Sequence, residues 1–159
     1  MIYIGAAVLI SGVVLVSRVF RDYLLWQIEL LDGFIAFIKK MNTHASSYLE
    51  PIKGWIFEFE CTPLEEIGLL PALRDGKMPK EAYRGLKTHP SSPEAHRALL
   101  SFFDRTGTGY ISEELVAQER CLAELTKIAE GARSDVPKRV RAFSALLFAL
   151  VGGGVILLL

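Results

Sequence analysis

The sequence predicts an all-α protein in which two terminal transmembrane helices flank a small cytoplasmic helical bundle. Uncharged apolar runs occupy residues 1–17 and 142–159, and all eighteen basic and eighteen acidic residues lie between them. Each run reaches the length of a minimal membrane-spanning helix, roughly 17 residues. Between the runs, apolar residues recur at helical spacing and no stretch alternates as a strand does. Helices are therefore expected throughout.

The first run is interpreted as an uncleaved anchor. A secretory signal carries positive charge before its apolar core and a small-x-small cleavage site after it, and neither is present here. Positive charge follows the run instead, at Arg18 and Arg21, and precedes the second run at Lys138, Arg139 and Arg141. Because basic residues beside a span stay on the cytoplasmic side, both ends place residues 18–141 in the cytoplasm.

Composition limits what residues 18–141 can do. Basic and acidic residues balance, which argues against a nucleic-acid partner. Cys61 and Cys121 lie far apart without ligand spacing, so they are expected to be free thiols in a reducing compartment. The three histidines lack metal-site spacing. No cofactor is expected.

The first helix is expected to continue past the membrane as one rod. Leu24, Ile28, Leu31, Ile35 and Ile38 recur at alternating spacings of four and three, which is typical of a packed helical seam. Pro51 can occupy the first turn of a second helix. In that helix an apolar face would be formed by Ile52, Trp55, Ile56 and Phe59. The two helices would form a hairpin.

Short helices with clear boundary signals are expected next. Thr62-Pro63-Leu64-Glu65 supplies a capping oxygen, an N-terminal proline and a glutamate three residues after the cap. Asp75-Gly76 closes that segment. Residues 74–93 read as a mobile, proline-broken region with one helix over Lys80–Leu86. Its excess of basic residues would contact anionic lipid or an acidic partner, or would simply be solvated.

Two further helices complete the domain. Ser92-Pro93-Glu94 begins the first of them, and a glycine-containing turn is expected over Thr106–Tyr110. Ser112, with Glu113 and Glu114, begins the last helix. Ser134–Pro137 is expected to interrupt that helix before the second apolar run.

Residues 104–112 follow the pattern of an EF-hand calcium loop only in part. Glycine and isoleucine occupy the sixth and eighth positions, but Thr106 and Thr108 stand where acidic ligands are usual. The twelfth position, which needs a bidentate glutamate, is Leu115. A helix–turn–helix corner is the favoured interpretation. No arrangement of nucleophile, base or phosphate-binding loop is visible, so no enzymatic activity is expected.

Two sets of residues are candidates for contacts with other helices or proteins. Exposed aromatic side chains anchor many interfaces, and the candidates are Trp55, Phe57 and Phe59. Since Phe57 lies about 200° around a helix from Trp55, one stripe cannot bury all three; the alternative is that Trp55 and Phe59 are core. Small residues allow close helix approach in membranes. The candidates for span packing are Gly5, Gly12, Ala145, Ala149 and Gly153, with plain lipid exposure as the alternative.

The order of these elements resembles stage III sporulation protein AB of endospore-forming bacteria, over nearly the whole chain. The resemblance rests on an anchor with trailing arginine, on the terminal Leu-rich run and on short elements between them. Those elements are Leu31-Asp32-Gly33-Phe34-Ile35, Tyr48-x-x-Pro51-Ile52, Gly68-Leu69-Leu70, Gly109-x-x-x-Glu113, Gln118 and Cys121.

That family is similar to the cytoplasmic domain of the type II secretion inner-membrane platform protein. The resemblance implies a membrane-anchored, non-enzymatic assembly component of a secretion-like channel joining mother cell to forespore. It also implies protein partners, namely a cytoplasmic secretion-type ATPase and other stage III sporulation membrane proteins. Two other classes remain open, a small two-span pore or stress protein and a membrane sensor with a degenerate EF-hand.

Overall fold

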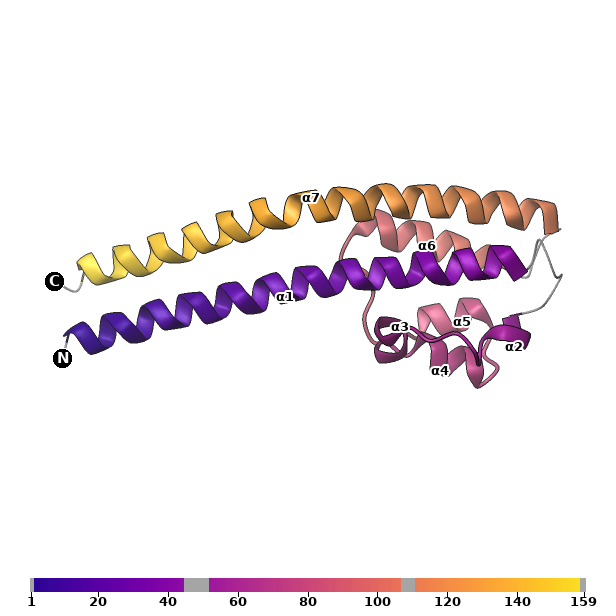
Figure 1. Ribbon diagram of the computed structural model, residues 1–159, viewed down its shortest axis with the longest axis horizontal. Helices are drawn as coiled ribbons and strands as arrows, with labels where there is room; N and C mark the ends of the chain where they lie inside the picture. Colours follow the sequence, from indigo (N-terminus) through magenta and orange to yellow (C-terminus); the bar gives the residue numbers. More distant parts are fainter. Residues whose placement is uncertain (1, 45–51, 107–110, 158–159) are drawn as a thin grey trace. The chain divides into compact units, whose positions relative to one another are not determined.

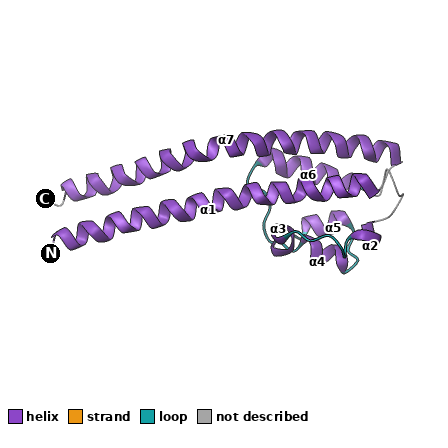
Figure 2. Ribbon diagram, in the orientation of Figure 1, coloured by secondary structure: helices purple, strands orange, loops and turns teal. Residues whose placement is uncertain are grey.

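A computed structural model describes residues 2–44, 52–106 and 111–157 (Figure 1). Every regular element in those ranges is a helix, which confirms the all-α fold class (Figure 2). The elements are α1 (Ile2–Thr43), α2 (Ile52–Trp55), α3 (Thr62–Glu66), α4 (Leu69–Arg74), α5 (Pro79–Arg84), α6 (Pro93–Arg105) and α7 (Ile111–Leu157).

The chain divides into two compact units. The first consists of Met1–Trp26 and Gly131–Leu159 and is called here the terminal helix pair; the second, Gln27–Glu130, is called the central domain. The sequence placed its boundaries after residues 17 and 141, at the ends of the apolar runs. Both α1 and α7 are continuous across the division into compact units.

The core of the central domain forms around the second half of α1. The predicted seam is confirmed at Ile28, Leu31, Ile35 and Ile38, which are all buried. Leu30, Phe34 and Phe37 are fully buried as well, so the packed surface of α1 is wider than a single seam. This width follows from the number of short helices that pack around α1. In the view of Figure 1, α2 to α5 lie below α1, whereas α6 and α7 lie above it.

Local signals account for most of the boundaries of the short helices. Ser92 caps α6, since its Oγ accepts a hydrogen bond from the Ala95 amide at 3.2 Å. Gly68, at φ +89°, separates α3 from α4 in a conformation that glycine adopts without strain. Asp75 closes α4 as predicted. The cap of α3 differs from expectation, because Cys61 occupies the cap position and gives no side-chain hydrogen bond.

The predicted interruption at Ser134–Pro137 is wrong. Pro137 lies inside the continuous helix α7, although proline removes one backbone donor from a helix. Ser134 donates its hydroxyl to the Gly131 carbonyl at 2.9 Å, which provides a local partner for one backbone acceptor in this stretch. The helix continues on both sides of Pro137 and thus tolerates one missing hydrogen bond.

The expected membrane spans over residues 1–17 and 142–159 are not supported by the described helices. Within the described ranges, no helix combines the length and the apolarity that crossing a membrane requires. Residue 1 and residues 158–159 of those expected spans lie outside the described residues. So do Tyr48 and Pro51, the expected start of the second helix, and residues 107–110 of the expected turn.

Candidate partner-docking surface

Two of the three candidate interface aromatics belong to the interior of the central domain. The Trp55 side chain is only 1% exposed, and its ring lies 5.5 Å from that of Phe37 and 5.4 Å from that of His44. Phe59 is half-buried, with its ring 5.8 Å from Phe37. Both residues therefore support the fold, and neither presents a free aromatic face to a partner.

Phe57 is the exception, because 65% of its surface is exposed. It follows α2, which ends at Trp55. Glu58 and Glu60, one and three residues after it, are exposed as well. These three residues, Phe57, Glu58 and Glu60, are called the Phe57 surface below. An exposed aromatic side chain near charged residues is typical of a docking site.

Arg74 of α4 holds the segment that carries Phe57. Its Nη2 donates to the Phe59 carbonyl at 2.8 Å, its Nε donates to the Ile56 carbonyl at 3.4 Å, and its Nη1 lies 2.6 Å from a Glu65 carboxylate oxygen. A non-helical segment leaves backbone carbonyls without helical partners, and the guanidinium satisfies two of them. The Phe57 surface is thus positioned by a partly buried charge network. It borders a pocket of about 450 Å³.

Cys61 lies beside the same pocket and is a free thiol, as is Cys121, which confirms the predicted state of both. Burial raises the pKa of Cys61, and the nearby Glu65 carboxylate raises it further, while a hydrogen bond from the Leu64 backbone opposes these two effects. A thiol with a raised pKa is a poor nucleophile. Cys61 instead packs against α1, since a Cβ placed on Gly33 would meet its Sγ at 2.8 Å.

A polar cluster that no sequence pattern indicated lies inside the central domain. The Tyr83 hydroxyl lies 2.9 Å from His96 Nδ1, and the rings of His89 and His96 are 4.7 Å apart. Burial raises the pKa of Tyr83, and burial together with the neighbouring His96 lowers the pKa of His89. Both shifts favour the neutral forms of Tyr83 and His89. Gln27 of α1 adds a long-range contact by accepting a 2.9 Å hydrogen bond from the Ser91 amide.

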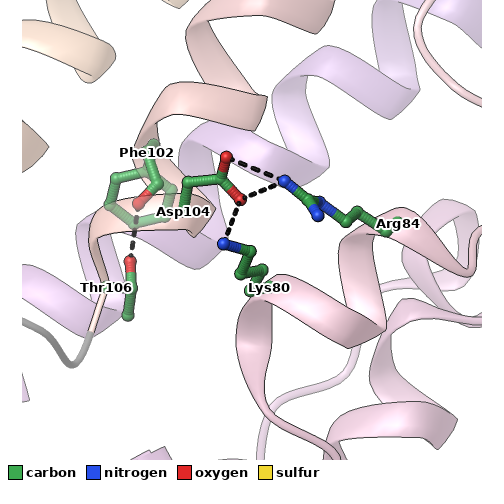
Figure 3. A network of polar contacts seen from close by, with 5 residues as sticks. All are labelled: Lys80, Arg84, Phe102, Asp104 and Thr106. Atoms are coloured by element: carbon green, nitrogen blue, oxygen red, sulfur yellow. Dashed lines mark hydrogen bonds and ion pairs between the residues drawn. The ribbon is translucent and has the colours of Figure 1, made fainter.

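Asp104, the first acidic position of the calcium-like pattern, joins α5 to α6 (Figure 3). Its carboxylate accepts two 3.1 Å hydrogen bonds from Arg84 Nη2, and Lys80 Nζ lies 3.5 Å away. Thr106 turns back to donate its hydroxyl to the Phe102 carbonyl at 2.9 Å. The carboxylate therefore balances two cations of this chain. In the part of the chain that the structure describes, no group of three or more acidic, cysteine or histidine side chains is arranged to hold a metal.

The terminal helix pair is held together by residues other than the predicted small ones. Val13 is buried, Phe20 stacks on Phe143 at 4.2 Å, and Ser144 donates a 3.1 Å hydrogen bond to Ser17. The candidate small residues lie elsewhere: Ala145 and Ala149 are exposed, and a Cβ added at Gly5, Gly12 or Gly153 would meet nothing within 4 Å. They do not make the contact between α1 and α7. Packing against a helix of another molecule stays a prediction.

Large apolar side chains cover the outward face of the same pair. Val8 is 66% exposed, Leu15 62% and Leu150 66%, and further exposed residues are Leu9, Ile10, Val14, Val16, Val19, Leu146 and Phe148. Large exposed apolar side chains gathered on one pair of helices mark a surface that something else covers.

The sequence did not predict a second polar surface, which is a groove between α6 and α7. Arg97 and Arg105 of α6 line a groove with Arg120 of α7. Their signal was available, because Arg97, Ser101 and Arg105 are spaced by four and therefore share one face of a helix. Arg120 of α7 lines the groove because residues far apart in the sequence pack together, and no local sequence pattern predicts this.

No protein-family model, curated protein sequence or solved structure matches this chain. The family resemblance therefore stays a prediction.

Proposed function

We propose that this chain is a membrane-anchored, non-enzymatic assembly component. In this proposal the terminal helix pair lies in a membrane, and the central domain docks protein partners on the cytoplasmic side. The observation that carries the proposal is the outward apolar surface of the terminal helix pair. Val8, Leu15 and Leu150 lead the set of large exposed apolar side chains there.

Removal of that apolar surface from water is energetically favourable. Removing one such side chain from water contributes about 1.5–3 kcal/mol, so the surface as a whole would drive strong association in water. Lipid tails are as apolar as leucine, and a bilayer therefore satisfies the surface without a protein partner. The Ser17–Ser144 hydrogen bond points toward the partner helix instead, where a polar group in hydrocarbon finds its best environment.

The positions of the basic residues support the proposed orientation, in which the central domain lies on the cytoplasmic side of the membrane. Within the terminal helix pair, the basic residues near the apolar stretches are Arg18 and Arg21 on α1 and Lys138, Arg139 and Arg141 on α7. Arg21 pairs with Asp22 and Lys138 with Asp135, both at 3.3 Å. These basic residues outnumber the two acids that pair with them. Along the chain they lie between the apolar stretches and the central domain, and basic residues beside a membrane segment favour the cytoplasmic face.

The partners follow from the resemblance to stage III sporulation protein AB. We propose docking to a cytoplasmic secretion-type ATPase and to other stage III sporulation membrane proteins, within a channel joining mother cell to forespore. The Phe57 surface is the proposed docking site. A non-enzymatic role is supported by the contacts of the titratable groups in the central domain. Asp104 pairs with two cations of α5, and Tyr83 of α5 contacts His96 of α6, so these groups join two helices of the fold.

Membrane attachment is tested with charged substitutions on the apolar surface. The full chain should remain in the membrane pellet after alkaline carbonate extraction, and Val8→Asp with Leu15→Asp should move most of it to the supernatant. Met78→Asp with Val116→Asp makes a matched control, since these residues are similarly exposed but belong to the central domain. If the wild-type chain is extracted by carbonate, the anchoring proposal is wrong.

Docking is tested by co-purification of membrane partners with the tagged full chain. Phe57→Ala should reduce recovery of partners, because it removes the exposed aromatic anchor. Met78→Ala, another exposed apolar residue of the central domain, should leave recovery unchanged. Equal recovery with both variants would remove Phe57 from the interface.

A further inference from the structure

Basic residues gather on the terminal helix pair where its apolar stretches end. This unit holds six basic and two acidic residues, and none of them lies within the apolar runs. Five of the bases lie closest to the apolar runs and are all exposed; they are called here the basic band and are Arg18 and Arg21 of α1 with Lys138, Arg139 and Arg141 of α7. The band therefore adjoins the exposed apolar surface directly.

The two halves of the basic band lie at the same level of the helix pair. The Ser144 hydroxyl donates a 3.1 Å hydrogen bond to Ser17, where α1 and α7 run side by side (Figure 1). At 1.5 Å per residue, Arg21 lies roughly 6 Å along the axis from Ser17, and Lys138 lies roughly 9 Å from Ser144. All five bases thus occupy one layer about 9 Å deep. The headgroup layer on each side of a bilayer is of similar depth, roughly 5–8 Å.

The acids of the terminal helix pair balance only part of this charge. Asp22 pairs with Arg21 and Asp135 pairs with Lys138, each at 3.3 Å, and the four side chains are 43–78% exposed. Exposed pairs of this kind are weak. No carboxylate of the described residues forms an ion pair with the other three bases, which are Arg18, Arg139 and Arg141. Three guanidinium groups can therefore bind an anion from outside the chain.

The neighbours of the basic band favour a lipid as the source of that anion. Val19 is 68% exposed and Tyr23 48% exposed, so apolar and aromatic surface continues among the charges. On the far side of Arg18 the exposed apolar surface begins with Leu15 and Val16. A phospholipid supplies an acyl chain and a phosphate side by side, whereas an acidic protein would match the charges alone. Long basic side chains suit this place, because their stems lie along apolar surface while their charges stay in the polar layer.

We propose that the basic band binds the phosphate groups of anionic phospholipids. The inference rests on the proposed membrane anchoring and names the lipid class that the anchor prefers. Guanidinium groups form short, charge-assisted hydrogen bonds with phosphate oxygens. A zwitterionic headgroup carries its own cation, which competes for the phosphate. Since one base near an anionic surface strengthens binding about fivefold, three unpaired arginines should give at least about a tenfold preference for anionic lipid.

Quenching of tryptophan fluorescence by brominated lipids tests the preference. The reporter is the full chain with Val19→Trp, between Arg18 and Arg21, and with Trp26→Phe; Trp55 is only 1% exposed, so lipid does not reach it. The chain is placed in vesicles of equal parts phosphatidylcholine and phosphatidylglycerol, with bromine on the acyl chains of one lipid or the other. Brominated phosphatidylglycerol should quench more strongly, with a relative association constant of about ten or more. Salt at about 1 M should remove most of the difference, because it screens exposed charges.

Two charge-matched variants of the reporter locate the contact. In the band variant the relative association constant should fall below about two, since the unpaired charges are gone; its substitutions are Arg18→Gln, Arg139→Gln and Arg141→Gln. The control variant removes the same charge from exposed positions of the central domain and should keep the preference; its substitutions are Lys53→Gln, Lys77→Gln and Lys87→Gln. All six residues are exposed, and circular dichroism checks that the helices are retained.

The outcomes separate this inference from the proposed function. Equal quenching by the two brominated lipids would overturn the inference and leave membrane anchoring intact. Quenching by neither lipid would overturn the anchoring and the inference together. If the control variant loses the preference and the band variant keeps it, the central domain binds the lipid and the inference is wrong. Equal quenching combined with loss of a co-purified acidic protein in the band variant would assign the basic band to that protein instead.

Discussion

The terminal helix pair and the central domain use the same two helices and dispose of their apolar residues in opposite ways. Leu15 and Leu30 both lie on α1, yet Leu15 is 62% exposed and Leu30 is fully buried. In the central domain, short helices cover several faces of α1. In the terminal helix pair only one stripe of each helix meets its partner, and the remaining apolar side chains face outward. The type of an apolar residue therefore does not by itself predict whether its side chain is buried within the protein or exposed.

The largest expected difference comes from one substitution made in both regions. Leu30→Ala should lower the free energy of unfolding of the central domain by about 2–5 kcal/mol, because it opens a cavity in a packed core. Leu15→Ala should change it by less than about 0.5 kcal/mol. Urea unfolding of the full chain in detergent, followed by Trp55 fluorescence in a Trp26→Phe background, measures both. Equal effects would mean that α1 is packed alike in the two regions.

Glycine positions sharpen the same contrast. Gly33→Ala should cost about 1–2 kcal/mol, since its new Cβ would lie 2.8 Å from Cys61 Sγ and 3.3 Å from Leu64 Cγ. Adding Cys61→Ala should recover most of that loss. Gly131→Ala in α7, where a Cβ meets nothing, should gain about 0.5–1 kcal/mol from helix propensity. Thermal unfolding measures the series. A Gly33→Ala variant as stable as the wild type would contradict the close packing of α1 on Cys61.

Ion pairs give a smaller effect. Asp104→Asn should destabilise the central domain by up to about 1 kcal/mol, because two cations on α5 lose their partly buried partner. Asp22→Asn, which breaks the exposed Arg21–Asp22 pair, should have almost no effect. Raising the salt concentration should shrink the Asp104 effect, since exposed charges are screened. A salt-independent loss would point to packing rather than charge.

The smallest effect on stability is expected from lowering the pH, and this effect depends on His89. Its pKa is lowered in the folded chain, mainly by burial, from an ordinary value of 6.5. The unfolded chain therefore binds more protons just below pH 6.5, and stability falls as the pH drops through that value toward the folded pKa. His89→Gln should flatten this dependence, whereas His44→Gln should keep it. Unfolding measured between pH 5 and about 7.5 decides, and identical pH profiles for the two variants would be the contrary result.

Local sequence signals predicted the positions of the helices more accurately than they predicted the contacts between helices. The seam of α1, the Ser92 cap and the end of α4 at Asp75 are each set by residues within one or two turns, and all three are confirmed. Pairs such as Arg84–Asp104 join residues from separate helices, and no periodicity encodes them.

The candidate site was predicted in the same uneven way. The helical geometry that set Phe57 apart from Trp55 identified the exposed aromatic residue. The role of Arg74 in holding that segment depends on packing between α4 and the chain after α2, which spacing alone does not reveal. The α6 half of the groove had a sequence signal, whereas its α7 half had none.

The central claim is that lipid covers the outward face of the terminal helix pair. Nitroxide labels placed in reconstituted vesicles through Leu15→Cys and Leu146→Cys, with Val116→Cys as the control in the central domain, test it directly. All three positions are exposed in this structure, so only their surroundings differ. The account predicts high oxygen and low nickel-chelate collision rates at positions 15 and 146, and the reverse at position 116. Nickel-chelate access at 15 and 146 equal to that at 116 would contradict it.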